Sequence, residues 1–109
     1  MTTFEKREQA EEARWSHDKD VQFRARARRN KLFGLWAGQL LGLGAAAAET
    51  YAKEVVIADF DKPGDGDVID KVLRDLKAKG VEMSEHRLQR RIDELMAEAR
   101  NQVMSEKKG

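Results

Sequence analysis

Apolar residues recur at spacings of three and four through most of the chain, and no segment alternates as a half-buried strand would. The longest apolar run, residues 32–48, follows a basic run, residues 24–31, with no proline between them. We interpret the two runs as the middle and end of one long helix that starts near residue 3. It ends at residues 42–44, where Gly42 and Gly44 favour a left-handed helix cap.

The apolar half of this helix is predicted to face the core. The expected stripe has spacings of three and four, and an adjacent strip contains Phe33, Ala37 and Leu41. The stripe consists of Leu32, Leu35, Trp36, Leu40 and Leu43. Because Gly34 and Gly38 each cost a helix about 1 kcal/mol relative to Ala, we expect them to allow a close crossing by a second helix.

Three shorter amphipathic helices are predicted after it. Residues 45–60 form the second, and residues 62–66 form a turn by composition. Asp67 caps the third helix, which Gly80 stops, and Ser84 caps the fourth. The expected inward residues are Tyr51, Val55, Val56 and Phe60, then Ile69, Val72, Leu73 and Leu76, then Leu88, Ile92, Leu95, Ala99 and Val103.

The predicted fold is therefore all-α, a four-helix bundle whose long first helix overhangs at its N-terminal end. We expect the bundle to span residues 20–105. Residues 1–19 are expected to be a mobile segment, and the chain is expected to fray from Met104, with a disordered tail over residues 106–109.

The first nineteen residues have good helix formers but few apolar side chains. Thr2 and Glu5 have the spacing of a capping box. Phe4 and Trp15 are eleven positions apart, which places them about 20° from one another around a helix. Such a segment would order on binding, with both aromatics entering a groove of a partner. A solvated helical extension fits the same pattern, and the residues alone leave the two interpretations even.

Charge and composition narrow the classes of function. The net charge is only +1, but residues 1–20 carry −2 whereas residues 21–31 carry five positive charges and no acid. The absence of cysteine suits a reducing cytoplasm, and the start of the chain lacks the order of a secretion signal. Residues 32–48 reach the lower length limit of a membrane span, but the glycine caps and the amphipathic segments that follow favour a buried core helix.

Catalysis and metal binding have little support. There is no cysteine, the three serines form no nucleophile arrangement, and the two histidines are too far apart for a metal site. Residues 59–70 place acids and a glycine as a calcium loop does, but Pro63 removes a ligand and Asp70 stands where a bidentate Glu belongs. A polar turn is the favoured interpretation.

The basic run leaves three options open. It lacks the interleaved aromatics and high pI of a nucleic-acid domain. A basic collar that meets the acidic end of a partner is at least as well supported. The third option is a nucleotide phosphate held near Arg28, Lys31 and Trp36.

Several strings resemble the zeta subunit of alphaproteobacterial F-type ATP synthases, a family often described only as a domain of unknown function. The resemblance covers nearly the whole chain and departs at residues 44–48 and 80–87. Its most specific string is Arg28-Arg29-Asn30-Lys31-Leu32-Phe33-Gly34-Leu35-Trp36-Ala37, and further matches are His17-Asp18 and Tyr51-Ala52-Lys53-Glu54-Val55-Val56-Ile57-Ala58-Asp59.

The resemblance implies a non-catalytic inhibitor of the F1-ATPase on the cytoplasmic face of the inner membrane, monomeric when free. Its N-terminal segment would become a helix wedged into a catalytic alpha/beta interface, reaching toward the central stalk gamma, while the bundle anchors outside F1. Binding of ATP or ADP is associated with the family, and no cofactor or nucleic acid is implied. The wedge residues carried over are Phe4, Arg7, Glu8, Glu11, Glu12 and Trp15.

Overall fold

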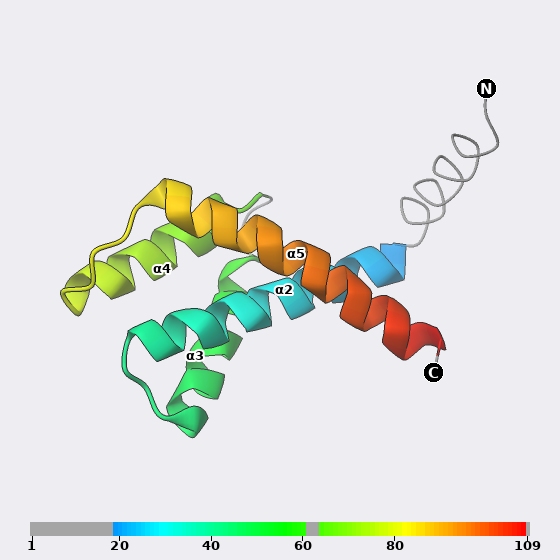
Figure 1. Ribbon diagram of the computed structural model, residues 1–109, viewed down its shortest axis with the longest axis horizontal. Helices are drawn as coiled ribbons and strands as arrows, with labels where there is room; N and C mark the ends of the chain where they lie inside the picture. The colour runs from blue at the N-terminus through cyan, green and yellow to red at the C-terminus, as the bar shows by residue number, and fades with distance from the viewer. Residues whose placement is uncertain (1–18, 61–63, 109) are drawn as a thin grey trace.

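The computed structural model describes residues 19–60 and 64–108, and Figure 1 shows the helices that they form. The predicted all-α four-helix fold is confirmed, and this part of the chain has no strand. The expected helix before residue 19 falls outside the described residues. The elements are α2 (Lys19–Leu40), α3 (Ala45–Ala58), α4 (Gly66–Ala78) and α5 (Glu85–Lys108).

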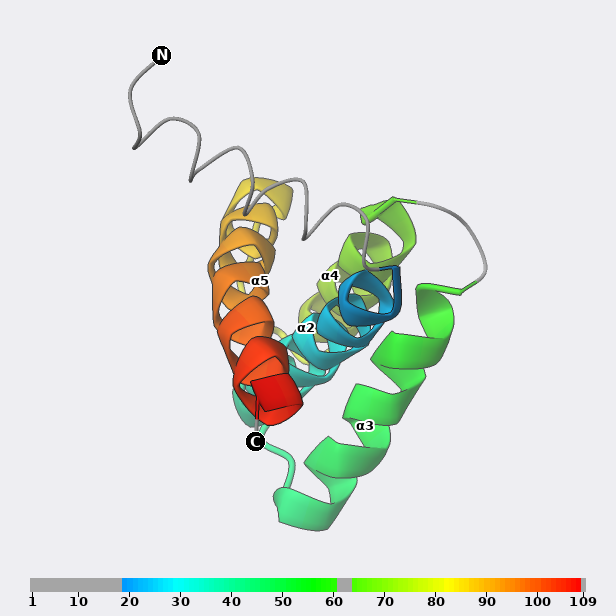
Figure 2. The same ribbon diagram turned by 90° about the vertical axis from the view of Figure 1, so that its right-hand side faces the viewer.

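Helix α2 is the central element. Viewed along its axis, α3 lies on one side and α5 on the other, with α4 behind (Figure 2). Because α2 contacts every other described helix, it needs more than one buried face.

Helices α2 and α3 pack closely, and two glycines of α2 give the physical reason. A Cβ added to Gly34 would lie 2.6 Å from Ala52 Cα, and one added to Gly38 would lie 3.0 Å from Ala48 Cβ. These glycines let the two backbones approach, as the sequence predicts.

The predicted core stripe of α2 is wrong in register. Phe33 and Ala37 are fully buried, whereas Leu32 and Trp36 only pack against the edge of the core and Leu40 is 37% exposed. The reason is that the glycine row faces α3, which turns the neighbouring Phe33 and Ala37 toward α4 and α5.

Helix α3 follows its predicted pattern at first and then departs from it. Tyr51 and Val55 are buried, as expected, and Val56 is partly buried. The helix ends at Ala58 rather than continuing to Phe60, and the Phe60 side chain is 61% exposed. Phe60 is therefore a surface residue, not the core residue that we predicted.

Helices α4 and α5 match the prediction more closely. The expected inward residues of α5, from Leu88 to Val103, are all buried, and in α4 only Leu73 is partly exposed. Helix α4 begins at Gly66 with Asp65 at its cap position, two residues before the predicted cap Asp67. Helix α5 continues to Lys108, past the predicted fraying point at Met104 and through most of the predicted disordered tail.

Gly42, Gly80 and Ser84 act at helix ends as predicted. Gly44 does not form the predicted left-handed cap, because its φ is −72° and it stands at the N-cap position of α3. Gly42 and Gly80 both have φ +78°, and each closes a helix with paired backbone hydrogen bonds. After α2, Leu43 N–H donates to Gly38 O; after α4, Val81 N–H donates to Leu76 O. Ser84 caps α5, because its Oγ accepts a hydrogen bond of 3.2 Å from Arg87 N–H.

The buried apolar side chains form two clusters. The larger one joins all four helices around Phe33, Leu76 and Leu88. The smaller one joins the start of α2 to the end of α5 through Val21, Ala25 and Val103. No helix in the described part is long and apolar enough to cross a bilayer.

The close approach of α2 and α3 predicts the effect of one methyl group. Gly34→Ala should lower the free energy of unfolding by on the order of 2 kcal/mol, because the new Cβ meets the Ala52 backbone and the helices must separate. Urea unfolding followed by circular dichroism measures this change. Gly66→Ala is the matched control, since Gly66 lies in the first turn of α4 with open space around it and no positive φ, and it should be neutral or slightly stabilising. Equal stabilities of the two variants would contradict the tight crossing.

Candidate functional site

The six wedge residues predicted from the resemblance, Phe4 to Trp15, lie outside the described residues. The described part begins at Lys19, where this segment joins α2. The first turns of α2 are the described part that follows these residues in the sequence.

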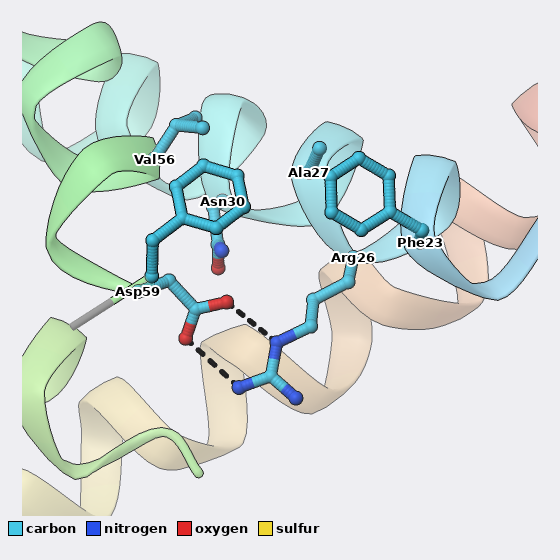
Figure 3. A pocket seen from close by; sticks show the side chains of 7 residues that line it. Phe23, Arg26, Ala27, Asn30, Val56 and Asp59 are labelled. Atoms are coloured by element: carbon cyan, nitrogen blue, oxygen red, sulfur yellow. Dashed lines mark hydrogen bonds and ion pairs between the residues drawn. The ribbon is translucent and has the colours of Figure 1, made fainter. Parts of the chain in front are cut away.

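The basic run of α2 is engaged mostly within the chain. Arg26 donates two hydrogen bonds to Asp59, from Nε at 2.5 Å and from Nη2 at 2.8 Å (Figure 3). Arg29 is 5% exposed and pairs with Asp65 at 2.9 Å. Asp59 caps the end of α3 and Asp65 stands at the start of α4. Together the two arginines hold both ends of the α3–α4 connection against α2.

The surroundings of Asp59 favour the ionised form of its carboxylate. Burial alone would raise the pKa of Asp59, but hydrogen bonds from Arg26 and Asn30 and the charges of Arg26 and Arg29 outweigh it and hold that pKa below 3.8. The hydrogen bond and charge of Asp59 also raise the pKa of Arg26, against the opposing effect of burial. The Arg26–Asp59 pair is thus a charged link between α2 and α3 at neutral pH.

Other arginines of the run face α5. Arg28 donates to Gln102 Oε1 at 2.8 Å and to Glu106 Oε1 at 2.6 Å. Arg24 lies 3.8 Å from Glu106 and 3.9 Å from Asp20. The run therefore joins α2 to α3, α4 and α5 rather than presenting a single charged face.

The predicted nucleotide residues do not converge. Arg28 is turned to α5, whereas exposed Lys31 lines a hollow with Glu49 and Lys53 of α3. Trp36 stacks on Phe33 with ring centroids 5.7 Å apart, and the Arg91 guanidinium lies 5.6 Å from its ring. The three side chains contact three different surroundings, so the structure gives no geometric support to a phosphate site made of them.

The acids weighed as calcium ligands are Asp59, Asp61, Asp67 and Asp70. Asp59 already pairs with Arg26, and Asp61 lies outside the described residues. Within the described ranges, no group of three or more His, Asp or Glu side chains could hold a metal ion.

Sequence reasoning did not identify the buried Arg29. Its guanidinium donates to Asn30 Oδ1 at 2.8 Å and 3.1 Å as well as pairing with Asp65, and along α2 it lies between Ala25 of the smaller cluster and Phe33 of the larger one. A signal was present, because position 29 falls in the four-residue row of buried positions 21, 25, 33 and 37. A charged residue in such a row requires an acid from another element.

Beside the Arg26–Asp59 ion pair lies a shallow hollow between α2 and the end of α3 (Figure 3). Its volume is about 240 Å³. The rings of Phe23 and Phe60 flank it with centroids 5.8 Å apart, and both side chains are more than half exposed. The other lining residues are Arg26, Ala27, Asn30, Val56 and Asp59. Sequence analysis gave no role to Phe23 and misplaced Phe60 in the core.

The chain matches known proteins over most of its length. The model of a family described as ATPase inhibitor subunit zeta matches residues 1–102. A solved chain described as a solution NMR structure is 46% identical, and the match covers 79% of this chain and 98% of that one with a TM-score of 0.70. No curated protein sequence matches.

The Arg26–Asp59 link makes a prediction about stability and pH. Asp59→Asn should lower the free energy of unfolding at pH 7 by about 1–2 kcal/mol, because Arg26 loses a charged acceptor. The folded-state pKa of Asp59 is depressed, so its contribution is complete above the unfolded value of 3.8 and disappears as the pH falls through the lower folded value. Urea unfolding at pH 7 and at pH 2–3 should show a deficit at pH 7 that shrinks in acid. A deficit that does not change with pH would contradict the charged link.

Proposed function

Since the chain belongs to the ATPase inhibitor subunit zeta family, we propose that it inhibits ATP hydrolysis by inserting residues 1–19 as a helix into a catalytic alpha/beta interface of F1. The inserted helix reaches toward the central stalk gamma and blocks rotation in the hydrolysis direction. Phe4 and Trp15 enter the interface as apolar anchors, and charged residues pair across it. These charged residues are Arg7, Glu8, Glu11 and Glu12. The inhibitor works on the cytoplasmic face of the inner membrane, bound to the synthase.

The observation that carries the proposal is the family match together with the place where the described core begins. Val21 is the first buried residue of the described bundle, and Val103 is its last buried apolar residue. No residue before Val21 belongs to the buried core of the described part. The segment is available to a partner without loss of the core that holds the body together.

The four-helix body also holds in place the start of α2, which follows residues 1–19 in the chain. Helix α2 continues directly from the junction at Lys19 into the core, and Arg26, Arg28 and Arg29 tie its first turns to the other helices. A helix that must resist a turning shaft needs its base to be held. The side-chain links on α2 meet this need, since load on the segment passes into the whole bundle.

Removing the segment is the decisive test. The chain without residues 1–19 should keep the melting temperature of the bundle to within a few degrees, because no described core residue is lost. It should no longer suppress ATP hydrolysis by F1 from the same organism, which the complete chain should suppress. Equal potency of the shortened and complete chains would refute insertion of this segment.

The two aromatic anchors can be tested separately. Phe4→Ala and Trp15→Ala should each weaken inhibition by on the order of 2 kcal/mol, about 30-fold, because central aromatic anchors dominate interface energies. Titration of F1 hydrolysis with each variant gives the half-inhibitory concentration. Gln9→Ala is the control, since Gln9 lies about 140° from Phe4 around a helix. Unchanged inhibition by both aromatic variants would assign the contact to other residues.

A further inference from the structure

We infer that the hollow between Phe23 and Phe60 is a second contact with the ATPase, which takes an apolar side chain from the surface beside the one that holds residues 1–19. This inference rests on the proposed function. It assigns a role to two residues of the body that the inhibitory segment does not contain.

Exposure of the two rings is built into the fold. The turn that ends α3 fixes Phe60, because its N–H donates to Ile57 O at 3.0 Å and the neighbouring Asp59 is clamped by Arg26. Phe23 lies on the regular part of α2, and the rings meet at an angle of 33°. Their exposed fractions are 56% for Phe23 and 61% for Phe60. Two large aromatics held side by side in water are typical of a recognition surface.

The chemistry of the hollow favours an apolar occupant. Among the described residues that line it, Arg26 is the only cation, and its two donors that face Asp59 are used by that carboxylate. Asn30 Oδ1 accepts from Arg29. The charges at the base of the hollow are therefore neutralised within the chain, and the walls are formed by Phe23, Ala27, Val56 and Phe60. A phosphate or carboxylate would find no free cation among these residues.

The small size of the hollow argues against two other occupants, a small-molecule ligand and a second copy of the chain in a stable dimer. A volume of about 240 Å³ is below the range of about 300–1,000 Å³ that is usual for small-molecule sites. A stable dimer engages 20–30 residues on each side, far more than this hollow supplies. One or two side chains fit, provided that another contact supplies most of the binding energy.

Residues 1–19 supply that other contact. Phe23 lies four residues beyond Lys19 on the same helix, about 6 Å along its axis. A partner that holds residues 1–19 up to this point is thus next to the hollow. Because Phe23 closely follows residues 1–19 along the chain, we assign the hollow to the ATPase and not to an unrelated protein.

The test uses the complete chain and three single variants. Phe60→Ala and Phe23→Ala should each raise the dissociation constant for F1 roughly tenfold, while maximal inhibition at saturation stays unchanged. Ile57→Ala is the matched control, because Ile57 is on α3, is 63% exposed and lines a different hollow. It should bind as the unaltered chain does. Melting temperatures should agree among all four proteins, since the changed side chains are mostly in water.

The outcomes separate this inference from the proposed function. If the unaltered chain binds and inhibits F1 and both phenylalanine variants bind equally well, the second contact is refuted and inhibition by residues 1–19 stands. If the unaltered chain does not bind F1, both fail. Self-association of the unaltered chain in sedimentation at 100 µM, abolished by Phe60→Ala, would also overturn the inference, because the hollow would then serve a second copy.

Discussion

The bundle depends on how closely α2 and α3 approach. Gly34 and Gly38 remove side chains where Ala52 and Ala48 need the space, so the two backbones come nearly into contact. This crossing turns Phe33 and Ala37 into the main core and brings the end of α3 beside the first half of α2. The reach of Arg26 to Asp59 and the meeting of Phe23 with Phe60 are both consequences of that geometry.

The second determinant is the neutralisation of a strongly basic stretch within the chain. Five positive charges in eight residues would repel one another on an exposed helix and would weaken it. Here the four arginines pair with acids on α5 or at the ends of α3 and α4, so each arginine also links α2 to another helix. Removing one acid would leave a buried or half-buried guanidinium without its partner. This lowers the free energy of unfolding more than replacing the whole ion pair by apolar residues would. The arginines of the basic run consequently form a structural clasp between α2 and the other described helices.

These two features support a division between a rigid body and a functional segment. The described core is complete from Val21 to Val103, and the clasp fixes the turns of α2 that follow the junction. The function that we propose would use such a division, because the energy that holds the body together would be independent of the energy that the segment gains on binding. The exposed aromatic pair lies near the start of the described body, where the body contact that we infer would add to the proposed segment contact with little further loss of freedom.

The sequence by itself determined the number and type of the helices, the glycine crossing, the glycine and serine caps, and the inward faces of α4 and α5. These features follow from local periodicity and backbone preference, which are properties of neighbouring residues. It also carried the family string. Only the tertiary structure decided the register of the buried face of α2, the exposure of Phe60, and the partners of Arg26, Arg28 and Arg29. The physical reason is that α2 packs on three helices at once: its apolar residues cover most of its circumference, so which of them become central depends on where the other helices cross it. The acids that pair with Arg26, Arg28 and Arg29 lie 33 or more residues away along the chain, where helical spacing carries no information about contact.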